Sequence, residues 1–113
     1  MKKTVLVAED EESVRYLLVE LLREEGYTVI EAEDGKDALD KFDTDVDVII
    51  SDFNMPKMNG AELFWATQNV NVKFILTSGH FDPIQVGAVI DAGASFVGKP
   101  SRLEEILKMV CDN

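Results

Sequence analysis

The stretch VLVAEDEE, residues 5–12, joins a short run of apolar residues to a run of four acids. The apolar part has the length of a buried β-strand, and apolar residues from Val14 to Leu22 then recur at helical spacing. Gly26 follows two glutamates and is well placed to end this helix with a left-handed cap. The chain therefore opens as a strand, an acidic loop and a helix.

The same strand and helix unit repeats along the rest of the chain. We expect four further strands, at residues 28–30, 46–51, 74–76 and 95–98. We expect three helices between them, at residues 36–42, 62–68 and 84–92, and a last helix after a capping-box pattern at Ser101 and Glu104. Five strands thus alternate with five helices.

This alternation predicts the fold class. Strands made of continuous apolar runs are buried on both faces, and right-handed crossovers through helices keep successive strands parallel. The economical architecture is an α/β protein in which a doubly wound, five-stranded parallel sheet lies between two layers of helices. Ligands of such sheets bind beyond the carboxyl ends of the strands, so the residues at those ends are the first candidates for a site.

The composition indicates one globular domain over residues 1–113, because 46 % of the residues are apolar and 29 % are charged. The 22 acidic and 11 basic residues give a net charge of −11, so we expect no direct binding to nucleic acid or to anionic membranes. The single cysteine, Cys111, excludes a disulfide framework. The first apolar segment is too short for a signal peptide, and we expect a cytoplasmic protein.

Polar side chains follow four of the five predicted strands. They are Glu9 and Asp10 after the first, Asp52 after the third, Thr77 and Ser78 after the fourth, and Lys99 after the fifth. Clustered carboxylates repel one another unless a cation lies among them, and their hard oxygen atoms suit Mg²⁺. With its charge neutralised, Asp52 is the best candidate for a nucleophile toward phosphorus, while Lys99 would stabilise charge on the equatorial oxygens.

Five short motifs appear in order along the chain. They are VAEDE at residues 7–11, ISDFNMP at 50–56 with Gly60 after it, LTSG at 76–79, AGA at 92–94 and KP at 99–100. Each motif alone is weak, but the ordered set is specific. In these motifs the chain resembles the receiver domain of bacterial two-component response regulators, of the chemotaxis-regulator type. The resemblance implies a flavodoxin-like (βα)5 fold with strand order 2-1-3-4-5.

The resemblance also implies roles for the acidic residues. Asp52 would accept a phosphoryl group from the phosphohistidine of a sensor histidine kinase or of a phosphotransfer protein. Asp10, Asp52 and the backbone carbonyl of Asn54 would bind Mg²⁺, and Glu9 would assist, through water. A receiver of this kind is not an enzyme acting on a separate substrate, since it promotes only its own phosphotransfer and its slow dephosphorylation.

A conformational switch is the second implication of the resemblance. Ser78 would be the switch hydroxyl, Phe96 the aromatic ring that rotates with it, and Lys99 would pair with the phosphoryl group. The kinase would dock against the first helix around Tyr16 and Val19. The signal would leave toward a downstream protein through the last two helices and the fifth strand. Thr77 shares the role of Ser78 or only ends its strand, and Phe96 is alternatively an ordinary core residue.

Other functions fit the residues less well. A haloacid-type phosphatase also places an aspartate nucleophile at a strand end, but it needs an acid two residues later, where this chain has Asn54. A Ca²⁺ loop starting at Asp52 fails because Pro56 and Lys57 stand where a ligand and a glycine are needed. A flavin site lacks a Ser/Thr-rich phosphate loop after the first strand. A phosphate-independent interaction module on the same fold stays open.

Overall fold

The computed structural model describes residues 3–68, 71–98 and 103–111. The strands are β1 (Thr4–Ala8), β2 (Thr28–Ala32), β3 (Val48–Asp52), β4 (Lys73–Ser78) and β5 (Ser95–Gly98). The helices are α1 (Glu12–Glu24), α2 (Gly35–Lys41), α3 (Gly60–Thr67), α4 (Pro83–Asp91) and α5 (Leu103–Cys111). Strands and helices alternate in these ranges as predicted. The predicted cap at Ser101 lies outside the described residues.

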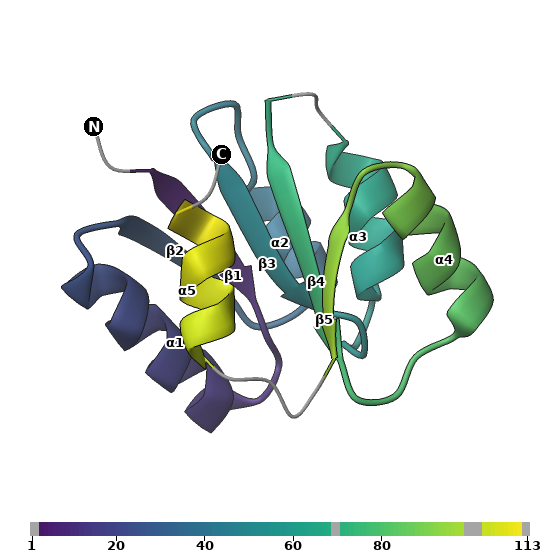
Figure 1. The fold of residues 1–113 in the computed structure, drawn as a ribbon, viewed down its shortest axis with the longest axis horizontal. Helices are drawn as coiled ribbons and strands as arrows, with labels where there is room; N and C mark the ends of the chain where they lie inside the picture. The colour runs from purple at the N-terminus through teal and green to yellow at the C-terminus, as the bar shows by residue number, and fades with distance from the viewer. Residues whose placement is uncertain (1–2, 69–70, 99–102, 112–113) are drawn as a thin grey trace.

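All five strands are parallel and lie in the order β2-β1-β3-β4-β5. In Figure 1, α1 and α5 cover one face of the sheet, and α2, α3 and α4 cover the other. The predicted doubly wound fold and its strand order are therefore confirmed. Because the strands are parallel, their carboxyl ends meet at one edge of the sheet, where Glu9, Asp10, Asp52 and Ser78 lie.

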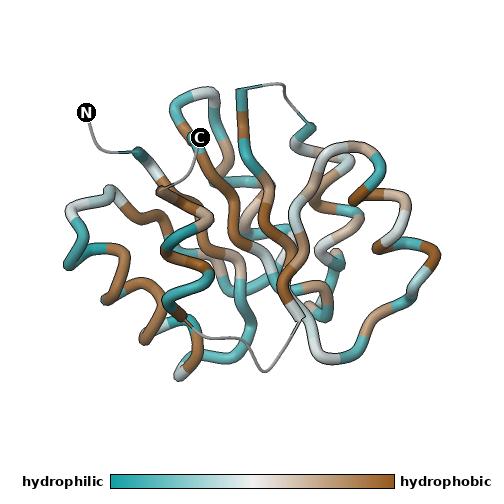
Figure 2. The backbone as a smooth tube through the Cα atoms, viewed as in Figure 1, coloured by the Kyte–Doolittle hydropathy of each residue, from teal (hydrophilic) through white to brown (hydrophobic). Residues whose placement is uncertain are grey.

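The central strands bury both of their faces, which explains their continuous apolar runs. In β3, Val48 and Ile50 pack with residues of α1 and α5, whereas Ile49 packs with residues of α2, α3 and α4. Figure 2 shows hydrophobic colouring along the strands in the middle of the molecule. Each fully buried aliphatic side chain contributes about 1.5–3 kcal/mol, so these strands form a rigid base for the loops at their ends.

Side-chain caps fix where α2 and α3 begin. At α2, the Asp34 carboxylate accepts a hydrogen bond from the backbone N–H of Asp37 at 2.7 Å. At α3, Asn59 and Glu62 each accept a hydrogen bond from the other's backbone N–H, at 2.8 and 2.9 Å. This capping box starts α3 at Gly60, two residues before the predicted start.

Two strands extend further toward the site than the sequence suggested. The strand expected at residues 46–51 is Val48–Asp52, and the one expected at 74–76 is Lys73–Ser78. The backbone N–H of Phe53 donates to the carbonyl of Thr77 at 2.8 Å and so continues the pairing of β3 with β4. Asp52 and Ser78 are therefore the last residues of strands, held by the sheet itself.

The exposed face of α1 differs from the prediction in one residue. Tyr16 is 62 % exposed, as a docking residue must be, but Val19 is only 1 % exposed and packs against the sheet. The prediction for Val19 is wrong because this residue shares the inward face of α1 with Leu22, three residues further on. Leu17, which is 56 % exposed, lies on the surface beside Tyr16 instead.

Two lysines from the opposite edge of the sheet anchor the end of α5. Lys3 donates to the carbonyl of Val110 at 2.8 Å, and Lys73 donates to the carbonyl of Met109 at 2.5 Å. These carbonyls lack partners within the helix, and the positive charges also favour the negative end of its dipole. Ile106 and Val110 are the buried residues of this helix.

Two glycine-to-alanine substitutions test the close packing at the start of α3. A Cβ atom at Gly60 would lie 2.5 Å from both the carbonyl oxygen of Asp52 and the Cδ1 atom of Leu76. We expect Gly60→Ala to lower the free energy of unfolding by about 1–3 kcal/mol. In α4, a Cβ atom at Gly87 meets no atom within 4 Å. Gly87→Ala should raise that free energy by about 0.5–1 kcal/mol.

Urea denaturation of both variants measures these changes. Equal effects of the two substitutions would contradict the packing argument.

Candidate functional site

The site begins where β1 and β3 end side by side. The two strands pair in register, with Ala8 beside Ser51. Glu9 follows this pair on one strand, and Asp52 follows it on the other. The neighbouring ends of parallel strands therefore bring the two acids together, and Asp10 enters the same region from the loop that leads to α1.

The carboxylates of Glu9, Asp10 and Asp52 form one cluster. Each residue offers a carboxylate oxygen, and these oxygens lie within 4.8 Å of one another. Glu9 is 4 % exposed and Asp52 is 8 % exposed, while Asp10 lies on the surface. Three like charges in so small a volume repel one another strongly, and partial burial weakens the screening by water.

Backbone hydrogen bonds hold Asp52 and its neighbours in place. The hydroxyl of Ser51 donates to the carbonyl of Asp52 at 2.9 Å. The carbonyl of Phe53 accepts a hydrogen bond of 2.9 Å from the N–H of Gly60 at the start of α3. The main chain at Asp52 is thus fixed between the sheet and the start of α3.

A hollow of about 420 Å³ opens beside the acidic cluster. Asp10 and Asn54 line it on one side, and Asp82 and Gln85, at the start of α4, line it on the other. Hydrogen bonds from the Gln85 side chain and from the backbone N–H of Ile84 hold the pKa of Asp82 below its usual value. Of the clustered acids, Asp10 is therefore reachable from solvent through this opening.

The donor set fits a small divalent cation. Opposite ligands of an octahedral Mg²⁺ ion stand about 4.2 Å apart, twice the ~2.1 Å of each bond, and water completes such sites. The three carboxylates lie close to that span, within 4.8 Å of one another. All of them offer hard oxygen atoms, and a cation among them would remove their repulsion. The predicted ligands Glu9, Asp10 and Asp52 are thus brought together.

Ser78, at the end of β4, takes part in a small hydrogen-bonded loop. Its hydroxyl donates to the carbonyl of His80 at 2.6 Å and accepts from the N–H of the same residue at 3.2 Å. The side-chain amide of Asn54 donates to the Ser78 hydroxyl at 3.3 Å and also to the carbonyl of His80. A hydroxyl has one hydrogen to donate, and the hydrogen of Ser78 is engaged with His80.

Phe96 lies on β5 and contacts the loop that precedes α4. Its ring meets the ring of Phe81 edge to face, with centroids 4.9 Å apart and an interplanar angle of 64°. Phe96 is partly buried and packs against the core, while Phe81 is 41 % exposed. The predicted switch aromatic therefore contacts the segment just after Ser78, and core packing and a switch role both remain compatible with this position.

One predicted site residue lies outside the described part of the chain, and two contacts near the site were not predicted. Lys99 lies outside the described residues. Arg15 was not predicted as a site residue, and its guanidinium donates to the carbonyl of Glu9 at 2.7 Å. The side-chain hydrogen bonds of Asn54 were also not predicted, and they join the end of β3 to the end of β4. The only signal in the sequence for the contacts of Asn54 was its polar side chain, two positions after the candidate nucleophile Asp52.

The family model of the response regulator receiver domain matches residues 5–111. The chain belongs to this family. The domain is thus a receiver of two-component signalling systems, as the order of its motifs indicated, and its acidic cluster lies where the receiver fold brings β1 and β3 together.

Similar proteins include both kinases and regulators. The chain is 36 % identical to the sensor kinase CckA of Brucella abortus over 113 residues, which cover 95 % of this chain and 12 % of that protein. It is 35 % identical to the response regulator RR06 of Streptococcus pneumoniae over 109 residues, which cover 94 % of this chain and 50 % of that protein. The chain therefore spans half or less of the length of these relatives.

The solved structure of the chemotaxis response regulator CheY4 of Vibrio cholerae is similar throughout. Its TM-score is 0.84 at 30 % identity, and the alignment covers 98 % of each chain. Within the described residues, no helix combines the length and the apolar character needed to cross a membrane.

Removing one charge from the cluster should stabilise the metal-free protein. We expect Asp10→Asn to raise the free energy of unfolding in EDTA by about 0.5 kcal/mol, because it relieves repulsion between like charges. Asp45→Asn is the matched control, since Asp45 is exposed in the loop before β3, at the opposite edge of the sheet. Urea denaturation at low ionic strength gives both values, and an equal rise in the two variants would contradict the repulsion.

Proposed function

We propose that this chain is a phosphorylation switch in which Asp52 accepts a phosphoryl group from the phosphohistidine of a sensor kinase or phosphotransfer protein. Residues 1–113 would act as one receiver domain, which then binds a downstream protein. The observation that carries the proposal is the cluster of Glu9, Asp10 and Asp52, whose carboxylate oxygens lie within 4.8 Å of one another at the carboxyl edge of a receiver fold.

Asp10, Asp52 and the backbone carbonyl of Asn54 would hold a Mg²⁺ ion, and Glu9 would act on it through water. When bound, the ion supplies positive charge that offsets both the carboxylates and the phosphoryl oxygens. Support comes from the hard oxygen donors of the cluster and from the hollow of about 420 Å³ that Asp10 and Asn54 line. A phosphohistidine ring in the hollow would approach the cluster from the side of Asp10 and Asn54.

In the transfer step, a carboxylate oxygen of Asp52 attacks phosphorus while the bond from phosphorus to the imidazole nitrogen breaks. The sheet and the start of α3 fix the backbone of Asp52, so the attacking oxygen is oriented before the donor arrives. Lys99 would pair with the phosphoryl oxygens. Release of the group by water would be slow and would return the carboxylate to its first state.

The switch would follow from a change of partner at Ser78. Its hydroxyl now donates to the carbonyl of His80 at 2.6 Å, and a phosphoryl oxygen on Asp52 would compete for the same hydrogen. When the hydroxyl of Ser78 turns toward the phosphoryl group, it releases the carbonyl of His80. This frees the segment that carries Phe81, whose ring contacts Phe96. The change would then reach the surface formed by α4, β5 and α5, where the downstream protein would bind.

The kinase would dock on the exposed side of α1. Tyr16 and Leu17 are 62 % and 56 % exposed, and this helix follows directly after the acidic loop. Large apolar side chains on the surface are frequent at protein interfaces. A partner held on α1 would present its phosphohistidine close to the edge of the sheet where Asp52 lies.

The acceptor is tested with a small phosphoramidate donor in Mg²⁺. We expect the wild-type protein to gain the mass of one phosphoryl group and Asp52→Asn to gain none, because an amide cannot form the acyl phosphate. Asp45→Asn should be labelled like the wild type. Intact-protein mass spectrometry measures the label. Labelling of Asp52→Asn at the wild-type rate would show that another residue is the acceptor.

Lys99→Ala separates metal binding from the response to phosphorylation. We expect its Mg²⁺ affinity to be no weaker than that of the wild type, since Lys99 does not bind the metal in the proposal and loss of its positive charge cannot repel a cation. Its apparent affinity for BeF₃⁻, which mimics the phosphoryl group, should fall about tenfold with the loss of a charge-assisted hydrogen bond.

NMR titration measures both affinities, and Lys108→Ala, an exposed change on α5, is the control. An undiminished BeF₃⁻ response of Lys99→Ala would remove Lys99 from the site.

A further inference from the structure

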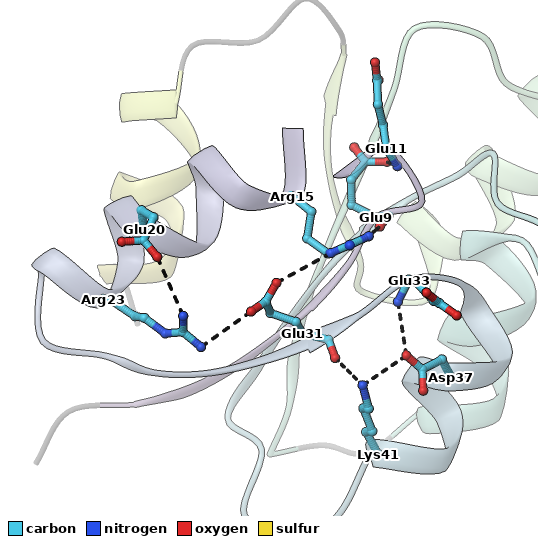
Figure 3. A network of polar contacts seen from close by, with 9 residues as sticks. All are labelled: Glu9, Glu11, Arg15, Glu20, Arg23, Glu31, Glu33, Asp37 and Lys41. Carbon is cyan, nitrogen blue, oxygen red and sulfur yellow. Dashed lines mark hydrogen bonds and ion pairs between the residues drawn. The ribbon is translucent and has the colours of Figure 1, made fainter. Parts of the chain in front are cut away.

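Arg15 on α1 joins the acidic loop to β2. Figure 3 shows its side chain between the backbone of Glu9 and the carboxylate of Glu31. The Nη1 atom donates to the carbonyl oxygen of Glu9 at 2.7 Å, and the Nε atom lies 3.5 Å from Oε1 of Glu31. The Arg15 side chain is only 16 % exposed, so it is held by packing as well as by its polar contacts.

The main chain of Glu9 is therefore fixed on both sides. Its N–H donates to the carbonyl of Ala32, the last residue of β2, at 3.1 Å. Its carbonyl accepts the short hydrogen bond from Arg15. The carbonyl of Glu9 and the N–H of Asp10 belong to one planar peptide unit, so the direction of this carbonyl sets the orientation of the next residue. Arg15 thus orients the peptide that carries Asp10 into the cluster.

We propose that Arg15 is a positioning residue for the metal site, which acts by holding the Glu9–Asp10 peptide rather than by contacting the metal. This inference rests on the proposed function, because it concerns the same acidic cluster. Partners that orient metal ligands without touching the metal typically change its affinity about 10–100-fold when they are removed. Asp10 depends most on such support, since it is exposed and lies on a loop.

The positive charge of Arg15 acting alone would change the Mg²⁺ affinity in the opposite direction. A guanidinium group beside three carboxylates repels an incoming cation, so removal of its charge should strengthen Mg²⁺ binding if Arg15 acts through its field alone. Removal of a group that only orients the Glu9–Asp10 peptide should weaken binding. The sign of the change therefore separates the two roles, and added salt screens the first role more than the second.

Arg23 provides a matched control on the same helix. Its Nη2 atom lies 3.6 Å from Oε2 of Glu31 and its Nη1 atom lies 3.7 Å from Oε1 of Glu20. It thus shares the Glu31 partner of Arg15, and Figure 3 places it on the far side of Glu31 from the acidic loop. Arg23→Gln removes the same charge from the same ion-pair network and leaves the bond between Arg15 and Glu9 in place.

Isothermal titration with Mg²⁺ at low and at physiological ionic strength tests the inference. We expect Arg15→Gln to bind Mg²⁺ about tenfold more weakly than the wild type at both ionic strengths. Arg23→Gln should stay within about twofold of the wild type. Unchanged or tighter binding by Arg15→Gln would overturn the positioning role. Absence of saturable binding by the wild type would instead overturn the proposed metal site, so the two failures are distinguishable.

A conservative variant keeps the inference testable when Arg15→Gln does not fold. Arg15→Lys keeps the charge, but its single ammonium lacks the planar fork that spans Glu9 and Glu31. We expect it to recover part of the affinity and to bind about threefold more weakly than the wild type. Amide NMR spectra in EDTA show whether each variant is folded. If Arg15→Gln does not fold, wild-type affinity of a folded Arg15→Lys would overturn the inference.

Discussion

Repulsion among the carboxylates of Glu9, Asp10 and Asp52 is the constraint around which the rest of the molecule is arranged. Their oxygens lie within 4.8 Å of one another, and two of the three side chains are buried. Such an arrangement is unfavourable by itself and persists only where the surrounding structure holds it. The hydrophobic strands β1 and β3 provide that support, because each lies between two layers of helices and ends at the cluster.

The second feature that matters is the polar link from β3 to β4. Asn54 stands two residues after Asp52, and its amide reaches both Ser78 and the carbonyl of His80. In the proposed switch, a change of charge at Asp52 would act on this hydrogen-bonded group, which already spans two strand ends. Phe81 follows this group directly and contacts Phe96 on β5, so packed side chains continue the path toward the surface.

Apolar runs and helical spacing were sufficient to predict every described element, the parallel sheet and the meeting of Glu9, Asp10 and Asp52. The ends of the elements were less predictable, because they depend on contacts between distant residues. The bond between Phe53 and Thr77 lengthens β3 and β4 in a way that no local pattern reveals. Val19 was misplaced for a related reason, since the inward face of a helix is fixed by what it packs against.

Arg15 was not predicted as a site residue because it contacts a backbone carbonyl. Every residue has such an acceptor, so the residue types in the sequence do not reveal the contact. Its position nevertheless has a consequence for the proposed docking surface. Arg15 turns inward to Glu9, whereas the next residue, Tyr16, is exposed on the same turn of α1. A partner that binds Tyr16 and shifts this turn would also shift the carbonyl contact that orients Asp10. In the proposed function, docking on α1 would thus be mechanically connected to the geometry of the acidic cluster through adjacent residues.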